Sequence, residues 1–481
     1  MKNKIVTRVI PSLMLASFML ASNVTADIPN NVLAAHGHSS HNDKYSNKGK
    51  DSDRNKKNSD DNSNLKLIPE SLENKTVIIY TNDSHGNIEG FKYVPAIEQK
   101  LKTLNADAVV TVDCGDFSET KTGTEYVEES EGRSAIQIMN AAGYDVVALG
   151  NHEFDFANYG SKDNKYSPDR TDEIQEKFSP EHANFKTISA NIVYEDDPSK
   201  TLMAPNTLYT AKDDNGNNLV NIGFFGLDTC ETEESGHKSS GLTNGLNFLD
   251  EHEKLYECAA NQVSSLKTQG ADLVICLAHL GIEQSDKREA AGDRSYEVYN
   301  GVKGGGIDLM LDANSHDVMT SWNGSAKSTA RDKNGRPEGL PITSTGKEFA
   351  NIGLVIIDND TKQIDNWLLL NESEYKEFTS DVTDNDAITA TKQLIKDTKD
   401  HKFTDTGVDK DYSKENNEVD TSGQVEETPE VIEETNNSQP ESEQNVDESQ
   451  KDDVTEDTQD DNDHTSDDHH HHRNNHGHHH H

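Results

Sequence analysis

The sequence predicts an α/β domain, and three features of the chain lead to that prediction. Apolar runs of strand length recur between about residues 75 and 402, and they alternate with longer segments of mixed polarity. The runs are nearly continuous in Val, Ile and Leu, which is typical of strands that are buried on both faces. Several of the intervening segments have the length and pattern of helices. Regular alternation of strands and helices indicates an α/β fold.

The expected elements can be placed in order along the chain. Strands are expected where the apolar runs lie: "VIIYT" (77–81), "AVVTVD" (108–113), "DVVALG" (145–150), "LVNIGFFGL" (219–227), "ADLVICLAH" (271–279), "IDLMLD" (307–312), "NIGLVIID" (351–358) and "QIDNWLLLN" (363–371). Helices are expected at 94–104, 132–142 and 248–269, with a last amphipathic helix at about 384–402. We therefore place one folded domain at 75–372 and a linker helix segment at 373–405.

The two ends of the chain are expected to lie outside this domain. A basic start is followed by an apolar stretch, Val9–Ala21, and by a plausible cleavage site at Val24–Ala26, so residues 1–26 are predicted to be a signal peptide. The apolar stretch is too short for a membrane anchor, and the protein is expected to be secreted or held at the cell surface. Residues 27–74 and the acidic, His-rich tail at 406–481 are so poor in apolar side chains that both are predicted to be disordered.

The charge of the chain limits the classes of partner. Lys and Arg number 45 against 88 Asp and Glu, which gives a formal net charge of -43. A surface that binds a nucleic-acid duplex would need a basic face, so this class of function is disfavoured. Small anionic substrates stay compatible with the charge, because a bound metal ion can reverse its local sign.

Polar side chains gather where the predicted strands end. Ligands of open α/β sheets bind at the carboxyl ends of the strands, so residues in these positions are candidate site residues. In chain order they are Asp83, His85, Asp116, Asn151, His152, Asp155, His279, Asn314 and His316. Each of them alone could cap a turn or lie in a core. Their joint occurrence at five strand ends predicts a functional site.

Carboxylate and imidazole groups in this number suit one kind of chemistry. They are ligands that zinc-like and manganese-like divalent cations prefer. Two such ions, about 3.5–4 Å apart, can hold the attacking and leaving oxygens of a displacement at phosphorus, and they lower the pKa of a water from about 15.7 toward 7. The sequence therefore predicts a dinuclear site that hydrolyses phosphate esters.

The order of these motifs resembles the calcineurin-like metallophosphoesterases. The resemblance covers about 75–402 and is carried by Asp83-x-His85, Gly115-Asp116, Gly150-Asn151-His152-Glu153, His279 and Asn314-x-His316. The stretches most similar to the secreted 5'-nucleotidase and 2',3'-cyclic phosphodiesterase branch are "TNDSHG" (81–86), "GNHEFD" (150–155), "SANI" (189–192), "GLDTCET" (226–232) and "TGKEFANIG" (345–353). The resemblance implies a four-layer α/β/β/α sandwich that binds two divalent metal ions, zinc, manganese or similar. It also implies a small phosphoester substrate, with nucleotides expected.

The resemblance further implies a role for each candidate residue. One metal ion would be bound by Asp83, His85 and His316. The other would be bound by Asn151 and His279, with Asn314 in the position of a further ligand, and Asp116 would bridge the two ions.

The same resemblance makes His152 the catalytic histidine. It would stabilise the phosphoryl group or protonate the leaving oxygen, and Asp155 would hold its ring. We also expect the 150–155 loop to be nonhelical, with backbone N–H groups directed at the anion.

Two departures from the family pattern affect these expectations. The family usually carries histidine where this chain has Asn314, and an amide oxygen is a weaker ligand than imidazole for zinc-like ions. The second metal ion is therefore expected to bind weakly, or to be manganese-like. Relatives also continue past the linker helix into a domain whose aromatic side chains stack on the nucleobase, whereas this chain continues into the acidic tail. A broader or different phosphoester substrate is therefore an open alternative.

Two other functions compete with hydrolysis. The clusters at His36–His41 and His464–His481 could chelate zinc, nickel or copper. The chain could then be a catalytically degenerate extracellular protein that scavenges zinc with its His-rich segments. It could also be a cell-surface binding module that keeps only the fold. Turnover that depends on Asp116 and His152 would separate the hydrolase from both.

Overall fold

The structure is a computed structural model that describes most of the predicted domain. The described residues are 63–118, 124–155, 174–232, 243, 245–249, 252–282 and 293–405. The predicted signal peptide, the first part of the predicted lead-in and the predicted tail lie outside these residues, as does a second unit, Glu418–His481.

Two six-stranded sheets form the centre of the described domain. The first has the order β16 (Gln363–Asn371), β15 (Asn351–Asp358), β1 (Lys75–Thr81), β2 (Ala108–Asp113), β3 (Val146–Ala148) and β4 (Lys186–Ile188). The second has the order β11 (Val318–Met319), β14 (Ile342–Thr345), β10 (Leu309–Leu311), β9 (Leu273–His279), β7 (Asn218–Asp228) and β6 (Asn206–Lys212). Two short strand pairs accompany them: β5 (Val193–Tyr194) with β8 (Leu246–Asn247), and β12 (Ser321–Trp322) with β13 (Lys327–Ser328).

Each sheet contains four neighbouring strands that are parallel. Strands β1 to β4 share one direction, and β15 runs antiparallel to both β1 and β16. In the second sheet β7, β9, β10 and β14 are parallel, and the edge strands β6 and β11 are antiparallel to their neighbours. Parallel strands place their carboxyl ends at a common edge of the sheet, where a site can form.

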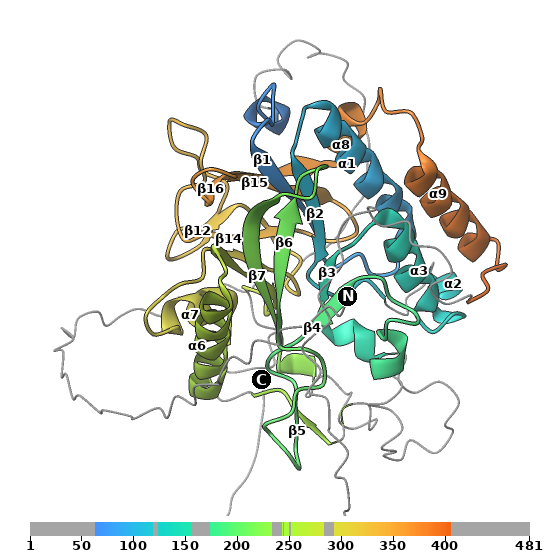
Figure 1. Cartoon of the computed structure of the whole chain (residues 1–481). Coiled ribbons are helices and arrows are strands. Elements are labelled where there is room, and N and C mark those ends of the chain that lie inside the picture. Colours follow the sequence, from blue (N-terminus) through green and yellow to red (C-terminus); the bar gives the residue numbers. More distant parts are fainter. Residues whose placement is uncertain are drawn as a thin grey trace, which may run out of the picture. The chain divides into compact units, whose positions relative to one another are not determined.

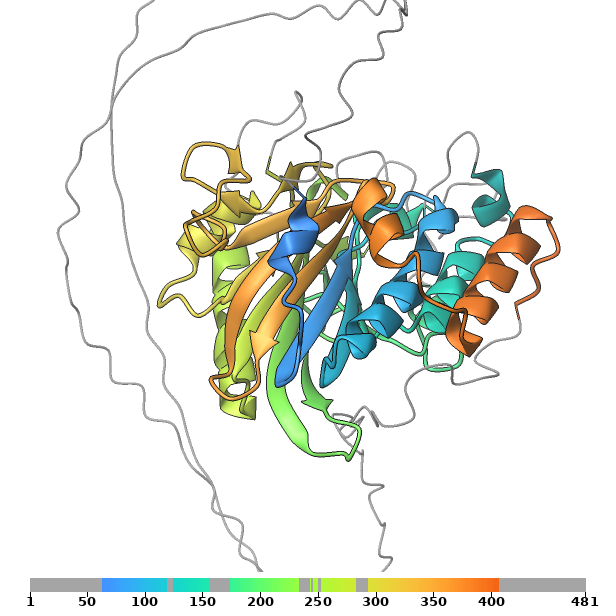
Figure 2. The same ribbon diagram turned by 90° about the horizontal axis from the view of Figure 1, so that it is seen from above.

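Helices cover the outer face of each sheet, so the layers are α/β/β/α (Figures 1 and 2). The first sheet is covered by α1 (Tyr93–Thr103), α3 (Arg133–Ala142), α8 (Glu372–Phe378) and α9 (Asp386–Lys399), with the short α2 (Glu125–Glu128) beside α3. The second is covered by α6 (His252–Gln269) and α7 (Ser295–Gly301). The predicted four-layer sandwich is confirmed.

The alternation of side chains along β1 explains the layering. Val77 and Ile79 pack in the core beneath the helices of the first sheet, whereas Ile78 and Tyr80 pack between the two sheets in the same core as Ile275 of β9. Successive side chains of a strand point to opposite faces, so both faces of β1 must be apolar. This is why the sequence shows a continuous apolar run there.

The folded part begins earlier than the sequence predicted. Residues 63–74 were assigned to a disordered lead-in, and this assignment is wrong for them. They include a 3-10 helix, η1 (Asn64–Leu67), whose Asn64 N–H donates to Glu374 at 2.7 Å. Leu72 is fully buried in the first core. A few apolar side chains in a polar stretch are therefore enough to anchor it.

The segment predicted as one linker helix contains two helices, α8 and α9. Both pack on the domain: Tyr375 of α8 and Ile395 of α9 belong to the core of the first sheet. All eight predicted strands and the other three predicted helices are present. Among the strands of the two large sheets, the sequence patterns missed β4, β6, β11 and β14, which are short, polar or at a sheet edge.

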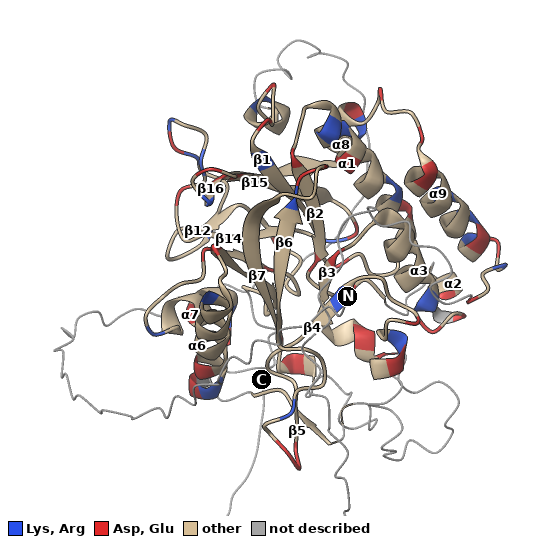
Figure 3. Cartoon of the chain, viewed as in Figure 1, with Lys and Arg blue, Asp and Glu red and all other residues tan. Residues whose placement is uncertain are grey.

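Charged side chains lie mostly on the helices and loops, and the strands carry few of them (Figure 3). All four cysteines are free, and Cys114, Cys230 and Cys276 are buried. Within the described ranges no helix has the length and apolar character needed to cross a membrane.

Candidate metal centre

Strand ends from both sheets meet and supply all nine predicted site residues. The first sheet contributes Asp83 and His85 after β1, Asp116 after β2, and Asn151, His152 and Asp155 after β3. The second contributes His279 at the end of β9, and Asn314 and His316 after β10. The strand-end pattern by itself indicated one edge of one sheet. The structure divides the site between two sheets, and contacts between their loops join its members into one cluster.

Asp83, His85 and His316 form the first group of metal-ligating atoms. The Nε2 atoms of His85 and His316 lie 2.7 Å apart, and each lies 3.6 Å from Oδ1 of Asp83. Asp83 is fully buried and His85 is 3% exposed. Burial lowers the pKa of His316, which keeps its imidazole neutral and able to bind a cation.

Asp116, His279 and Asn151 form the second group. Nε2 of His279 lies 3.1 Å from Oδ2 of Asp116 and 3.2 Å from Oδ1 of Asn151. The other ring nitrogen of His279 lies 2.7 Å from the carbonyl oxygen of Cys114. A carbonyl can only accept, so Nδ1 carries the proton and Nε2 is left to bind a metal ion.

Asp116 lies between the two groups. Ligand atoms of Asp83, Asp116 and His279 lie within 4.8 Å of one another, and so do those of His85, Asp116 and His152. Burial alone would raise the pKa of Asp116, but the charges of the surrounding histidines, His279 first, outweigh burial and lower it. A carboxylate in this position can reach cations in both groups.

His152 and Asp155 form a pair beside these groups. Nδ1 of His152 lies 2.7 Å from Oδ2 of Asp155, and Nε2 lies 3.9 Å from Oδ2 of Asp116. The His152 side chain is 27% exposed, so it is accessible to a substrate.

The prediction of a nonhelical 150–155 loop is wrong. Residues Asn151–Phe154 form a 3-10 helix, η3. The His152 N–H donates to Oδ1 of Asp116 at 2.8 Å, and the Gly150 N–H donates to Oε2 of Glu153 at 2.7 Å. Both N–H groups are therefore occupied inside the protein and are not directed at an anion.

The backbone of the site is unusual. Five of the predicted ligands have a left-handed backbone, with φ from 47° to 73°, which non-glycine residues adopt rarely. They are Asp83, His85, Asp116, Asn314 and His316. Such conformations cost free energy and cluster at functional sites.

The donor set fits divalent cations. Asp83 and Asp116 are at most 1% exposed, yet within the described residues neither carboxylate is paired with Lys or Arg. Buried carboxylates are normally paired with cations or bound to metal ions. Two carboxylates, at least three imidazoles and an amide oxygen are a mixed set that zinc or manganese can use.

No model of a protein family matches the chain. Over 303 residues it is 26% identical to the trifunctional nucleotide phosphoesterase protein YfkN of Bacillus subtilis, covering 58% of this chain and 19% of that protein. Over 259 residues it is 27% identical to a 5'-nucleotidase of Vibrio cholerae, covering 51% and 41%. Over 321 residues it is 26% identical to the snake venom 5'-nucleotidase of Gloydius brevicauda, covering 62% and 48%.

The relatives of this chain are thus nucleotide phosphoesterases and 5'-nucleotidases, at modest identity over about half of its length. The chain spans less than half the length of each of these three relatives. The crystal structure of the calcineurin-like phosphoesterase YfkN from Bacillus subtilis aligns with 68% of this chain and 99% of that one, with 21% identity and a TM-score of 0.49.

The departure from the family pattern at Asn314 has a defined geometry. The Asn314 N–H lies 3.1 Å from both carboxylate oxygens of Asp83. Its side-chain Nδ2 donates to the carbonyl oxygen of Leu280 at 3.4 Å. That hydrogen bond fixes the amide and leaves Oδ1 as the atom that can bind a cation.

Glu153 is a positioning residue of the described domain to which the sequence patterns assigned no role. Its carboxylate accepts from the N–H groups of Gly150, Asp116, Phe117 and Ser118 at 2.7–3.2 Å. It therefore ties the loop after β2 to the loop after β3. Burial, followed by the charge of Asp116, raises the pKa of Glu153 to about 7. Its place in the "GNHEFD" motif was the only sequence signal.

Replacement of Glu153 by alanine should destabilise the domain by at least about 3 kcal/mol, because several buried N–H donors would lose their acceptor. Urea denaturation measures this loss. Glu73→Ala is the matched control, since Glu73 is exposed and should change stability by less than about 0.5 kcal/mol. Equal stability of the two variants would contradict the positioning role.

Asp228 is a second residue that the motif analysis left without a role. It ends β7, directly across from His279 in the β7–β9 register, and it is fully buried. Its backbone is held by Asn191, whose side chain forms hydrogen bonds of 2.7 and 2.8 Å with the carbonyl oxygen and the N–H of Asp228. The "SANI" (189–192) and "GLDTCET" (226–232) stretches thus contact each other beside the strand end that carries His279.

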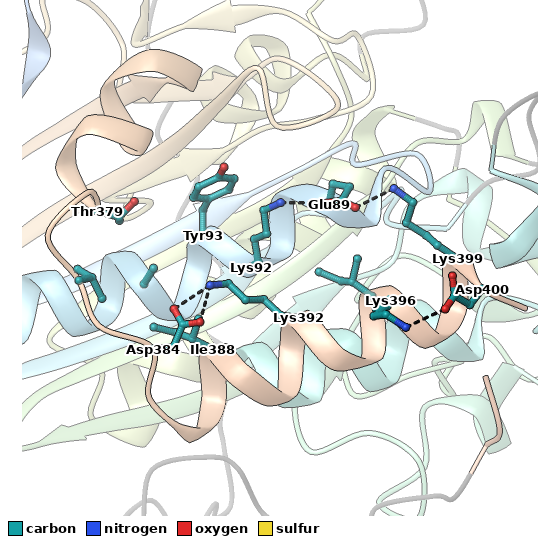
Figure 4. A pocket seen from close by; sticks show the side chains of 13 residues that line it. Glu89, Lys92, Tyr93, Thr379, Asp384, Ile388, Lys392, Lys396, Lys399 and Asp400 are labelled. Atoms are coloured by element: carbon teal, nitrogen blue, oxygen red, sulfur yellow. Dashed lines mark hydrogen bonds and ion pairs between the residues drawn. The ribbon is translucent and has the colours of Figure 1, made fainter. Parts of the chain in front are cut away.

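A groove of about 550 Å³ between α1 and α9 contains none of the site residues. Each lysine that lines it already has a carboxylate partner (Figure 4): Lys92 and Lys399 contact Glu89, Lys392 contacts Asp384, and Lys396 contacts Asp400. Its cations are neutralised, so it is a poor site for an anionic substrate.

Proposed function

We propose that this protein hydrolyses phosphate esters, with nucleotides as substrates, and that it uses two divalent metal ions. The observation that carries the proposal is the convergence of two donor groups on Asp116, with the His152–Asp155 pair beside them. The names of the relatives support the substrate: YfkN is a nucleotide phosphoesterase, and the others are 5'-nucleotidases.

In this proposal each group of residues holds one ion. Asp83, His85 and His316 would hold the first, Asn151, His279 and Asn314 would hold the second, and Asp116 would be available to both. When bound, the two ions neutralise the phosphoryl oxygens and provide hydroxide at neutral pH.

His152 supplies acid–base chemistry in this proposal. Its Nδ1–H is held by Asp155, so Nε2 can keep a proton and pass it to the leaving oxygen of the ester. Asp155 also stabilises the charged imidazolium, because it places a carboxylate 2.7 Å from the ring.

The test is phosphate release from AMP and from an aryl phosphate monoester and diester. Protein stripped of metal and reloaded with manganese or zinc is compared with the metal-free protein. We expect turnover that depends on metal, and the preferred ester identifies the substrate class. Absence of turnover with every ester and metal, in protein shown to be folded, would refute the proposal.

The amide at Asn314 makes the second ion a weak zinc site in this proposal. Asn314→His should raise the zinc affinity of this site by at least about tenfold, because imidazole is a better zinc ligand than an amide oxygen. Replacing residues that only support a metal ligand already changes metal affinity by about tenfold or more. Isothermal titration with zinc measures the change. Asn300→His adds an imidazole on α7, outside the predicted ligand set, and should leave the site affinity unchanged. Equal affinities of Asn314→His and the unaltered protein would contradict the ligand role.

We also propose that the protein is exported, on the basis of the signal-like pattern at 1–26. Cell fractionation with and without these residues tests this. The alternative zinc-scavenging function rests on His36–His41 and His464–His481, which lie outside the described residues.

A further inference from the structure

Asp312 is a buried carboxylate beside the metal centre. It lies directly after β10 and two residues before Asn314, and it is 1% exposed. Among the described residues its Oδ2 atom has no hydrogen-bond partner. A buried oxygen in this state destabilises a fold, and such atoms are rare in native proteins. The presence of Asp312 therefore calls for an explanation other than stability.

The side chain of Asp312 points away from the metal-ligating atoms. Leu311 and Ala313 pack in the core between the two sheets, so Asp312, which lies between them, faces the side that α6 and α7 cover (Figure 1). In β9, Ala278 packs on that outer side, and the next residue, His279, points back toward the first sheet. Asp312 and His279 thus lie on opposite faces, and Asp312 can act on the metal centre only through the backbone.

The Asp312 carboxylate holds the loop that follows His279. Its Oδ1 atom accepts from the N–H of Gly281 at 3.2 Å and from the hydroxyl of Ser295, the first residue of α7. The N–H of Ser295 in turn donates to the carbonyl oxygen of Gly281 at 3.1 Å. Gly281, Ser295 and Asp312 are therefore bonded to one another in a closed set, and Gly281 is only two residues from His279.

Further hydrogen bonds join the loop after β9 to the loop after β10. The side chain of Asn314 donates to a carbonyl oxygen of the first loop at 3.4 Å, and the N–H of Ile282 donates to Oγ of Ser315 at 3.0 Å. These two loops carry His279 and Asn314. Their spacing therefore decides how two proposed ligands of the second ion lie relative to each other.

We propose that Asp312 is a positioning residue of the second ion. It fixes the loop that carries His279 against the loop that carries Asn314, and in this way it raises the affinity for that ion. The proposal rests on the proposed function, which requires the second ion. The first ion depends less on Asp312, because its ligands Asp83 and His85 come from the other sheet.

The test is manganese binding by titration calorimetry, which resolves the two ions by their affinities. Replacing residues that support a metal ligand lowers affinity by about tenfold to a hundredfold, and we expect that loss for the second ion alone in Asp312→Ala. Electron paramagnetic resonance should then show a lone manganese ion at a concentration that gives a coupled pair in the unaltered protein. Asp312→Asn keeps an acceptor oxygen and should retain most of the affinity.

Asp308→Ala is the matched control. Asp308 precedes β10, and its Oδ2 atom accepts from the N–H of Val274 at 2.7 Å, so it joins the same two strands at their other end. Its loss should leave both affinities unchanged. Ser295→Ala removes one donor to Asp312 and should weaken the second ion by about fivefold, as for one hydrogen bond. This milder variant decides the question if Asp312→Ala does not fold.

Equal weakening of both ions, an unchanged second ion in Asp312→Ala and Ser295→Ala, or the same loss in Asp308→Ala would overturn the proposal. So would an Asp312→Asn protein as weak as Asp312→Ala, since the hydrogen bonds would then not be what acts. Unaltered protein that binds fewer than two ions would overturn it as well. Protein that binds both ions but releases no phosphate would refute the proposed function and leave this test valid.

Discussion

Replacement of Asp116 by asparagine should remove metal-dependent phosphate release almost completely, with a loss of at least about a thousandfold in kcat. Asp116 lies between the two donor groups, and it contacts His279 at 3.1 Å. Metal ions contribute several kcal/mol to such reactions, and each 1.4 kcal/mol is about tenfold in rate. The rate is measured with the preferred ester at saturating manganese.

The Asp116 variant should also bind fewer metal ions per chain, as measured by elemental analysis after dialysis. Asp272→Asn is the matched control, because Asp272 precedes β9, at the end of the strand away from His279, and accepts from a backbone N–H. It should keep both activity and metal content. A fully active Asp116→Asn protein would rule out the bridging role.

Replacement of His152 by alanine should lower kcat by roughly a hundredfold to ten-thousandfold, the usual contribution of a general acid or base. The metal content should stay at the level of the unaltered protein. This pattern separates a catalytic histidine from a ligand. The distinction is needed because His152 lies within ligand distance of His85 and Asp116. Steady-state kinetics and elemental analysis on the same preparation measure both quantities.

Asp155→Asn provides a graded comparison for His152. In this structure Nδ1 of His152 lies 2.7 Å from Oδ2 of Asp155, and an amide could still contact Nδ1. It would not stabilise the charged imidazolium, so we expect kcat to fall by about tenfold to a hundredfold, less than in His152→Ala. His401→Ala removes an exposed histidine just after α9 and should leave the rate unchanged. Loss of metal from His152→Ala would show instead that His152 is a ligand.

The sequence alone determined the layers of the fold and the identity of the candidate site residues. The buried strands must be apolar on both faces, as the placement of Ile78 and Ile79 in different cores shows. Charged groups and imidazoles are costly to bury within such strands, so a residue of this kind at the end of one, such as His279 in the β9 run, is a local signal that can be recognised in the sequence. The motif order then supplied the resemblance to a family.

The elements that the sequence did not predict carry weaker local signals. β14 reads "ITST", and β6 is an edge strand whose side chains alternate in burial. Strands of this kind are stabilised by pairing with neighbours more than by their own residues. The same reason explains why residues 63–74 were assigned to the lead-in: Leu72 is buried by a core that other segments build.

Only the tertiary structure decided how the site is assembled. His85 and His316 are 231 positions apart in the chain, and no local pattern states that their Nε2 atoms lie 2.7 Å from each other. The supporting contacts of Glu153 also depend on which loops meet where the strands end. Residue types and strand ends are properties of short stretches, so the sequence determines them. Distances between strand ends come from packing one sheet on the other, which only the folded chain specifies.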